Sequence, residues 1–312
     1  MCINKKNYRG SSTTGSRKTD RSTSCFYKKI ILEGLDFMKK NSLILLLVFA
    51  VCFFAITSCS KKKADSSAAV SENAVEALKA RGVLIMGYDI QFPPLAYSDD
   101  NGDLIGYDVE LATEVAKRLG VELKPLPIDW DDKDNELENG TIDCIWSGYT
   151  ITEPRKKAHS LTFPYLTNDQ VLIVRKEGAV KSFTDLKGRV IGLRSASSSE
   201  DAINSNPSFR NTLGDIIEYK DNKTCLDDLK VGAIDAMVMD GCFAYFLATK
   251  TGEPFDVIKT PLSSEEYSIC FRKNEPELRD EVEKILLEMA ADGTIAQYTT
   301  KWFGQDVSLI GK

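Results

Sequence analysis

The sequence has only one histidine, His159, among its 312 residues. A zinc site built on several imidazoles is therefore excluded, and a Ser-His-Asp triad could use only that one ring. None of the eight cysteines belongs to a C-x-x-C pair, which argues against zinc ribbons and thioredoxin-type redox motifs. A G-x-S-x-G elbow is also missing. From these absences we expect no metal, no cofactor and no enzymatic activity.

Long hydrophobic runs are missing as well, since no apolar run reaches the ~20 residues that a membrane-spanning helix needs. The apolar run 43–56 follows Met38, Lys39 and Lys40 and leads into Ser58 and Cys59. A cationic start, a short apolar run and small residues are typical of a secretory signal peptide, and an uncleaved membrane anchor is the alternative. The ending I-T-S-C resembles the lipobox of bacterial lipoproteins, which implies that Cys59 carries lipid. We expect 1–37 to be a leader without structure upstream of the true start, 38–58 the signal peptide and 59–74 a lipidated tether.

Basic residues are scarce after this leader. From Cys59 onward the chain has 30 Lys and Arg against 43 Asp and Glu, a net charge of −13. Such a surface repels nucleic acid and anionic lipid. We expect an exported monomer that the lipid on Cys59 anchors to the outer side of a cell membrane, with no nucleic-acid partner. Export permits disulfides, and the sequence leaves open whether any form among Cys144, Cys225, Cys242 and Cys270.

Strand and helix patterns alternate along the exported chain. Asp108 is expected to cap a helix whose apolar face ends at Leu119 and Gly120. A D-D-N-G-D turn after Tyr97 predicts a hairpin. A calcium loop beginning at Asp99 is the alternative, although it has leucine where such loops need glycine. The alternation predicts an α/β fold with largely parallel sheets, its strands lying near 83–86, 121–126, 142–146, 171–174, 189–193, 216–219, 234–239 and 266–271.

One pattern occurs twice. Residues 136–143 and 228–235 both read acidic-Leu-x-x-Gly-x-Ile-Asp, and both lead into an apolar strand. The repeat predicts two similar lobes, and a common turn repeated by chance is the alternative. In open α/β sheets ligands bind beyond the carboxyl ends of strands. Those ends are 147–150 in the first unit and Asp240 with Gly241 in the second.

The first strand end leads into a helix start. Thr152 is a plausible N-cap, and Glu153 and Pro154 suit the first helical positions. Arg155 then lies in the first turn, where the helix dipole disfavours a cation. An anion facing it would explain this position, since a guanidinium can bind a carboxylate bidentately. With Asp240 as the partner of an ammonium group, the two ends predict a receptor for a zwitterion, although each residue alone also suits a structural ion pair.

Motifs along residues 82–304 resemble the bacterial extracellular solute-binding protein family 3, the amino-acid receptors of ABC importers. They occur in the family's order at 87–94, 99–102, 106–112, 140–143, 150–155, 163–165, 186–188, 232–236, 292–294 and 301–304.

This resemblance implies a two-lobe periplasmic-binding-protein fold of type II, with crossover strands near 168–171 and 267–269. Lobe 1 would comprise 75–168 and 268–312, lobe 2 would comprise 169–267, and the lobes would close on the ligand. The resemblance also implies a set of ligand contacts: Gly148, Thr150, Arg155 and Ser198 for the α-carboxylate, Asp240 for the α-ammonium, and Asp89, Phe92, Trp130 and Arg194 for the side chain. The loop before Ser198 lacks the family's usual glycine, so Ser197 is the alternative to Ser198.

We therefore expect a substrate-binding protein that delivers a free polar amino acid to the permease of an ABC importer. Arg194 in the pocket would repel a cationic side chain, which favours glutamine, cystine or glutamate. If Asp89 pairs with Arg194, the pocket is nearly neutral and glutamine or cystine is favoured over glutamate; Arg194 could also turn out to solvent. The alternatives are an enzyme of the same fold, such as a dehydratase, or a sensor that presents its ligand to a receptor.

Overall fold

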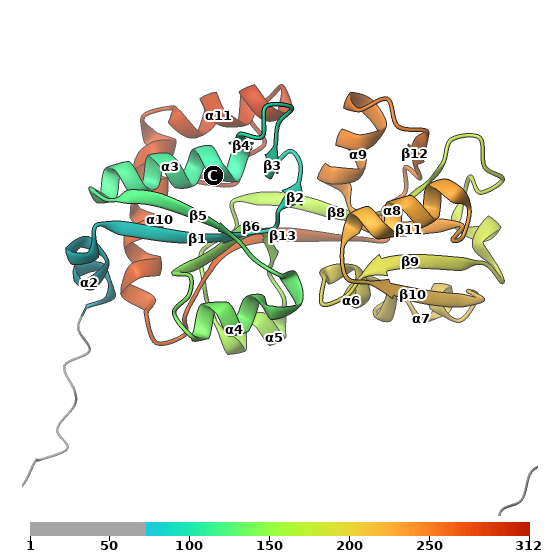
Figure 1. The fold of residues 1–312 in the computed structure, drawn as a ribbon, viewed down its shortest axis with the longest axis horizontal. Coiled ribbons are helices and arrows are strands. Elements are labelled where there is room, and N and C mark those ends of the chain that lie inside the picture. Colours follow the sequence, from blue (N-terminus) through green and yellow to red (C-terminus); the bar gives the residue numbers. More distant parts are fainter. Residues whose placement is uncertain (1–72) are drawn as a thin grey trace, which may run out of the picture. The chain divides into compact units, whose positions relative to one another are not determined.

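The computed structural model describes residues 73–312 (Figure 1), which belong to one unit of the chain, 70–312. The leader, the signal peptide, Cys59 and the tether up to residue 72 lie outside the described residues. The last residues of the predicted tether already start a helix, because the Asn73 side chain accepts a hydrogen bond from the backbone N–H of Val75 (3.0 Å). Among residues 73–312, no helix has the length and hydrophobicity to cross a membrane.

The structure contains helices and strands in alternation. The helices are α2 (Ala74–Arg81), α3 (Tyr107–Leu119), α4 (Lys133–Glu138), α5 (Glu153–Ala158), α6 (Ser198–Asn204), α7 (Pro207–Arg210), α8 (Asn222–Val231), α9 (Gly241–Lys250), α10 (Pro276–Ala291) and α11 (Thr294–Phe303). The strands are β1 (Val83–Tyr88), β2 (Gln91–Phe92), β3 (Ala96–Ser98), β4 (Leu104–Ile105), β5 (Glu122–Pro127), β6 (Cys144–Thr150), β7 (Ser160–Leu161), β8 (Leu166–Arg175), β9 (Val190–Arg194), β10 (Asp215–Tyr219), β11 (Ala236–Asp240), β12 (Phe255–Val257) and β13 (Ser263–Phe271).

Two lobes meet along β8 and β13 (Figure 1). In one lobe β1 pairs in parallel with β5 and β6, and in the other β9 pairs in parallel with β10 and β11. Between the lobes β8 and β13 lie antiparallel, with Ser263 opposite Gln170 and Tyr267 opposite Leu166. Because β9 to β12 lie between β8 and β13 in the sequence, the chain crosses from one lobe to the other and returns. The predicted two-lobe α/β fold is confirmed.

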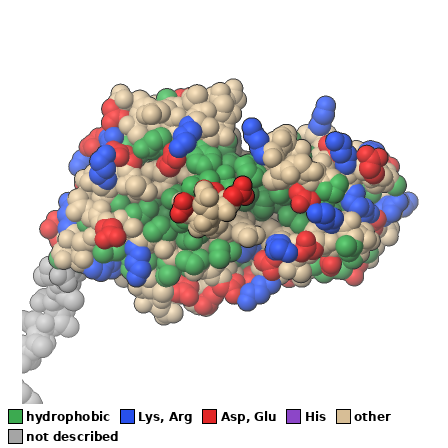
Figure 2. Space-filling model, turned by 45° about the horizontal axis from the view of Figure 1, so that its top comes forward, with side chains coloured by type: hydrophobic (Ala, Val, Ile, Leu, Met, Phe, Trp, Pro, Cys, Tyr) green, Lys and Arg blue, Asp and Glu red, His purple; other side chains and the backbone are tan. Residues whose placement is uncertain are grey.

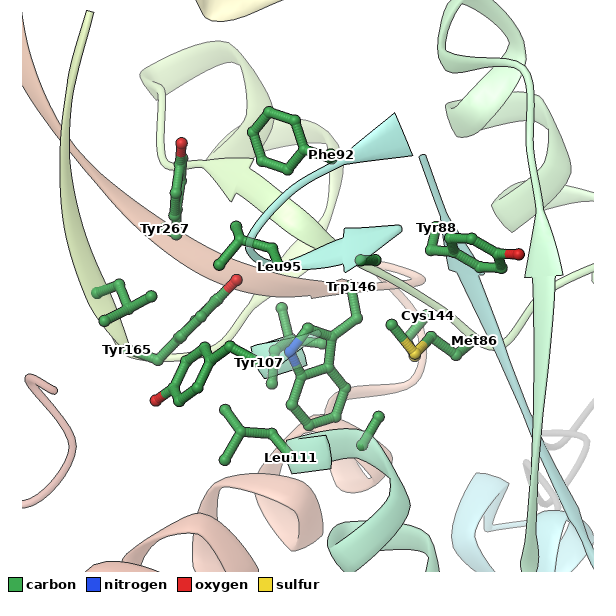
Figure 3. Close-up of a cluster of buried hydrophobic side chains, with 14 of the residues drawn as sticks. Met86, Tyr88, Phe92, Leu95, Tyr107, Leu111, Cys144, Trp146, Tyr165 and Tyr267 are labelled. Carbon is green, nitrogen blue, oxygen red and sulfur yellow. The ribbon is translucent and has the colours of Figure 1, made fainter. Parts of the chain in front are cut away.

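The core of the first lobe lies between the sheet and helix α3 (Figure 3). The helix ends at Gly120 in the left-handed conformation, as the sequence predicts, and its expected apolar face is buried. The prediction that Asp108 caps this helix is wrong. Gly106 is the N-cap, and the fully buried Asp108 carboxylate accepts instead from Gly148 N (3.2 Å) and from the hydroxyl of Tyr165 (2.9 Å). The helix begins at Tyr107, so Asp108 already lies inside its first turn and its side chain is turned into the core.

The repeated sequence pattern builds the same local structure twice. In the first copy Asp143 accepts from Ile85 N (2.7 Å), and in the second Asp235 accepts from Val190 N (3.2 Å). Each aspartate thus ties the start of its strand to the neighbouring parallel strand, and each pairs with an arginine. The two copies therefore correspond in structure as well as in sequence, one in each lobe.

The turn between β3 and β4 forms the predicted hairpin. Asp99 Oδ1 accepts from the backbone N–H groups of Asn101 (2.9 Å) and Asp103 (3.0 Å), and Glu110 pairs with Lys301. These side chains hold the turn and an ion pair instead of converging on one point, so the calcium alternative is not supported.

Cysteines 144, 225, 242 and 270 are free thiols.

Candidate functional site

One cavity between the lobes gathers every residue that the sequence proposes for ligand binding. Its volume is about 20 Å³, roughly the space that one water needs. This space is smaller than a free amino acid. The lining consists of Asp89, Phe92, Trp130, Ser147, Gly148, Thr150, Arg155, Arg194, Ser197, Ser198, Ser199, Asn222 and Asp240.

The cationic side of the cavity is built where β6 meets α5. Thr152 is the N-cap of α5, as predicted, and its hydroxyl accepts from the backbone N–H of Arg155 (3.3 Å). The Arg155 guanidinium lies 4.3 Å from the centroid of the Tyr149 ring and donates to the carbonyl of Thr150 (2.9 Å). That bond uses one of the five N–H donors of a guanidinium. The side chain is therefore held against the strand end with donors left for an anion in the cavity.

Gly148 lies in the middle of this wall and has a left-handed backbone, with φ of 59°. A Cβ atom there would lie 2.6 Å from Cε1 of Phe92, so the position requires glycine both for its conformation and for the close approach. Its N–H donates to the buried carboxylate of Asp108. Burial raises the pKa of Asp108 to about 7, and the hydrogen bond from Tyr165 lowers it in part.

Ser198 faces the cavity from the second lobe. Its hydroxyl lies 3.1 Å from that of Thr150 and 3.1 Å from the amide nitrogen of Gln170. Ser197 instead acts as the N-cap of α6, where its hydroxyl accepts from Ser199 N (3.3 Å). Both serines line the cavity, and only Ser198 bridges to the other lobe.

The anionic side of the cavity is Asp240, at the end of β11. Its Oδ1 accepts from the side-chain amides of Asn168 (2.9 Å) and Gln170 (3.1 Å) and from the hydroxyl of Tyr267 (2.5 Å). Burial raises the pKa of Asp240 to about 7, and the nearby negative charge of Glu265 adds to this effect. Arg155 and Asp240 thus present opposite charges to one cavity from two lobes.

Four residues around Asp240 are not among the ligand contacts predicted from the sequence: Asn168, Gln170, Glu265 and Tyr267. Glu265 Oε1 lies 3.1 Å from the hydroxyl of Thr150 and within hydrogen-bond distance of both amides that contact Asp240. The sequence does contain a signal for them, because each crossover strand has two polar residues at positions i and i+2. Side chains at these positions point to the same face of a strand.

An ion pair forms the side-chain end of the cavity. Arg194 pairs with Asp89, and their side chains are only 10% and 8% exposed. The guanidinium lies 5.6 Å from the centroid of the Trp130 ring, and its Nε has no hydrogen-bond partner among the described residues. Arg194 therefore turns inward, and its charge is balanced while one donor stays open.

A larger hollow of about 810 Å³ lies beyond this ion pair. Asp89, Arg194 and Asn222 line both the small cavity and the hollow. Its other walls include Tyr97 of the first lobe and Phe246 of α9, whose rings lie 5.4 Å apart. Figure 2 shows hydrophobic side chains gathered where the two lobes meet on this side of the molecule. The ion pair thus separates a small polar cavity from an open, partly apolar hollow.

Comparisons with known proteins show the family to which the chain belongs. Residues 84–305 match the sequence profile of the bacterial extracellular solute-binding proteins, family 3. The L-cystine-binding protein TcyJ of Escherichia coli K12 is 34% identical over 240 residues, which cover 76% of this chain and 88% of that protein. Relatives of this kind are amino-acid-binding proteins of ABC transporters.

Two solved structures have the same fold. One is an ABC uptake transporter substrate-binding protein from Streptococcus pneumoniae with bound histidine, with a TM-score of 0.72 and 29% identity over 77% of this chain and 99% of that one. The other is an ancestral amino-acid-binding protein described as a precursor of cyclohexadienyl dehydratase. It has a TM-score of 0.65 and 31% identity, covering 74% of this chain and 99% of that one.

Proposed function

Since the chain belongs to the bacterial extracellular solute-binding proteins of family 3, we propose that it captures a free polar amino acid between its lobes and delivers it to the permease of an ABC importer. The observation that carries this proposal is the position of Arg155 and Asp240. They come from different lobes, line the same cavity and carry opposite charges. A zwitterion placed between them pairs its carboxylate with Arg155 and its ammonium with Asp240.

Hydroxyl and backbone groups would complete the binding of the α-carboxylate. Thr150 and Ser198 approach each other within 3.1 Å across the lobes, and Gly148 brings its backbone to the cavity surface without a side chain. A carboxylate held by Arg155 can accept from these two hydroxyls, because charge-assisted hydrogen bonds to guanidinium and hydroxyl donors are strong. Phe92 and Trp130 then flank the side chain of the ligand.

The side-chain end of the cavity favours cystine and glutamine over glutamate. The Asp89–Arg194 pair leaves little net charge for a second anionic or cationic group to meet. The open Nε donor of Arg194 suits an amide or carboxylate oxygen. The hollow beyond the pair offers room for a ligand that is longer than the small cavity, as cystine is, and a relative 34% identical to this chain is named for cystine.

The hinge and the anchor belong to the same proposal. Lobe 1 comprises 75–168 and 268–312, lobe 2 comprises 169–267, and the crossover strands β8 and β13 flex between them. Cys59 is the mature N-terminus and holds the exported chain on the membrane. A Cys59→Ala chain is expected to leave the membrane fraction or to stay unprocessed, and normal processing and anchoring would contradict the lipoprotein assignment.

Competition calorimetry with cystine, glutamine, glutamate, arginine and histidine tests the ligand class. We expect cystine or glutamine to bind most tightly and arginine to compete poorly. The tightest binding by arginine or histidine would contradict the assignment of Arg194 to the pocket. Both amino acids are included because solved structures of similar proteins contain histidine or L-arginine.

Whether the protein is an enzyme or a binding protein can be tested by asking whether the ligand is chemically changed. The proposal is that the ligand is released unchanged, so incubation followed by mass spectrometry should recover all of it. Loss of water or ammonia from the ligand would instead indicate catalysis by carboxylates such as Asp240. Genetic removal of the permease separates transport from sensing, because uptake then stops although binding continues.

A further inference from the structure

Two carboxylates converge beside the proposed ammonium position. Asp240 Oδ1 lies 2.9 Å from the amide nitrogen of Asn168, and Glu265 Oε1 lies 2.7 Å from the same nitrogen. The amide nitrogen of Gln170 lies 3.1 Å from the Asp240 oxygen and 3.0 Å from the Glu265 oxygen. Both amides are therefore shared by both acids, which makes the two carboxylates close neighbours.

The orientation of the two amides is fixed by their carbonyl ends. The Asn168 carbonyl accepts from the backbone N–H of Cys242 (3.3 Å), and the Gln170 carbonyl accepts from the hydroxyl of Ser199 (2.7 Å). Each NH₂ group must then point at Asp240 and Glu265. Asn168 and Gln170 are themselves buried. The structure thus holds both NH₂ groups close to the pair, and that of Gln170 also lies 3.1 Å from the hydroxyl of Ser198.

The charges around the pair do not balance it. From β13 it meets the hydroxyl of Tyr267, and from α9 the thiol of Cys242 lies 3.7 Å from that hydroxyl. Burial raises the pKa of both Tyr267 and Cys242, so both stay neutral. Of the cations lining the cavity, Arg155 donates to the carbonyl of Thr150 and Arg194 pairs with Asp89. In the part of the chain that the structure describes, no Lys or Arg forms an ion pair with Asp240 or Glu265.

Two neighbouring carboxylates without a cation cannot both ionise readily, and one keeps a proton near neutral pH. An ammonium group placed against them supplies the missing positive charge. We propose that Glu265 is a second anionic contact of the ligand's ammonium group, and that the Asp240–Glu265 pair releases one proton when that group binds. This inference rests on the proposed function, because it needs an amino acid in the cavity.

The proton balance is simple. Before binding, the pair holds one proton and carries a charge of minus one. The ligand keeps all three protons of its ammonium group, the displaced proton passes to the buffer, and both carboxylates are ionised in the complex. Affinity should then fall about tenfold for each pH unit below the titration of the pair, because binding must displace a proton there.

The test compares Glu265→Gln with Glu266→Gln in the full chain. Glu266 is the exposed neighbour on the same strand, so its replacement removes an equal charge outside the cavity. Calorimetry with L-cystine, L-glutamine and L-glutamate is run at about pH 5.5 and about pH 8.5, on either side of the pair's titration, in two buffers that differ in ionisation enthalpy. We expect wild type and Glu266→Gln to release about one proton per ligand at the lower pH and almost none at the higher pH. Glu265→Gln removes the like charge that adds to the effect of burial on Asp240, so it should release fewer protons than wild type at the lower pH and should bind about tenfold more weakly at the higher pH.

Infrared spectroscopy of the ligand-free protein tests the protonation of the pair without any ligand. At the lower pH the wild-type spectrum should contain a carboxylic-acid band that is weaker in Glu265→Gln and unchanged in Glu266→Gln. Asp108 also titrates near neutral pH, but it is not among the residues lining the cavity, so this comparison leaves its band unchanged.

Three results would overturn the inference. They are binding at the lower pH without proton release, a Glu265→Gln protein that behaves like Glu266→Gln, and an acid band that does not depend on Glu265. Failure of wild type to bind any of the three amino acids is distinguishable from these results. It would contradict the proposed function and, with it, the assignment of Glu265 to an ammonium group.

Discussion

Arg155 lies where a helix normally disfavours a cation, and its surroundings explain why it is stable there. The first turn of α5 presents backbone N–H groups and a partial positive charge. The guanidinium turns back onto the Tyr149 ring and the carbonyl of Thr150, which offset this repulsion. It is thereby fixed at the cavity wall before any ligand arrives.

Arg155→Ala should therefore weaken ligand binding while the protein stays folded. Removing one partner of a buried charge pair costs about 3–5 kcal/mol, which corresponds to a loss of roughly 100-fold to 3,000-fold in affinity. Titration calorimetry with the tightest ligand of the competition series measures this change. Lys156→Ala is the matched control, because Lys156 pairs with Glu153 on the exposed side of the same helix. Affinity within threefold of wild type for Arg155→Ala would contradict its role.

Asp108 makes stability depend on pH in an unusual direction. Its pKa is about 7 in the folded protein against an ordinary value of 3.8, so between these values the folded state binds more protons than the unfolded state. The free energy of unfolding should then fall as the pH rises from about 4 to about 7, by up to about 4 kcal/mol from this residue. Asp240 contributes in the same direction.

Asp108→Asn should reduce this slope, because the asparagine carbonyl can still accept from Gly148 N and Tyr165 but does not titrate. Urea unfolding at several pH values measures the slope in both proteins. A slope unchanged by the substitution, or a wild-type stability that rises over this range, would show that Asp108 is ionised in the folded state.

At the scale of elements, two arginines hold the repeated helix–strand units together. Arg272 follows β13 and donates to the carbonyls of Leu137 (2.9 Å) and Ile142 (2.6 Å). Arg175 ends β8 and donates to the carbonyls of Leu229 (2.6 Å) and Ile234 (2.7 Å), which are the equivalent positions of the second unit. Carbonyls at the end of a helix have no partner within it, so a guanidinium placed there satisfies them. The arginine at the end of each crossover strand thus binds the repeated helix–strand unit of one lobe.

Arg272→Ala should destabilise the fold by about 2 kcal/mol, because it removes the guanidinium donors of the Leu137 and Ile142 carbonyls and one of the two arginines that pair with the buried Asp143. Arg189→Ala is the control, since Arg189 is 40% exposed and its pair with Asp235 is worth about 1 kcal/mol or less. Chemical denaturation measures both changes. If Arg272→Ala cost no more than Arg189→Ala, the arginine would not be the link between β13 and the repeated unit.

Local chemistry was enough to predict several elements. Thr152 and Gly120 begin and end their helices as their residue types favour, and the repeated Gly-x-Ile-Asp pattern marks the start of two strands. The crossover strands were predicted too short, because polar residues at both ends of β8 and at the start of β13 interrupt the apolar pattern. Among them Asn168 and Gln170 are buried by contacts with Asp240 and Glu265, partners that lie far away in the sequence.

At the scale of the whole molecule, the cavity is assembled from segments spread between residues 89 and 240. Spacing in the sequence could not show that Arg155 and Asp240 face one cavity. The family resemblance supplied nine of the lining residues. It did not point to Glu265, which becomes significant only because β13 brings it beside Asp240. Likewise, the inward turn of Arg194 follows from its contact with Asp89, which is 105 positions earlier in the chain.

Closure of the lobes on the ligand is expected from the small volume of the cavity. A space of about 20 Å³ is smaller than an amino acid, so we expect the lobes to open for entry and to close afterwards. Small-angle scattering should therefore show a smaller radius of gyration with saturating ligand than without it. The Arg155→Ala protein should not contract at the same ligand concentration. An unchanged radius for wild type would indicate a rigid pocket instead of a closing cleft.

The most direct measurement of the central claim is a crystal structure grown with the tightest-binding amino acid of the competition series. The account predicts one ligand between the lobes, with its α-carboxylate in hydrogen-bond contact with the Arg155 guanidinium. Its ammonium should lie against Asp240, and its side chain should point toward the Asp89–Arg194 pair. A ligand bound elsewhere, or bound in this cavity without contact to both Arg155 and Asp240, would contradict the account.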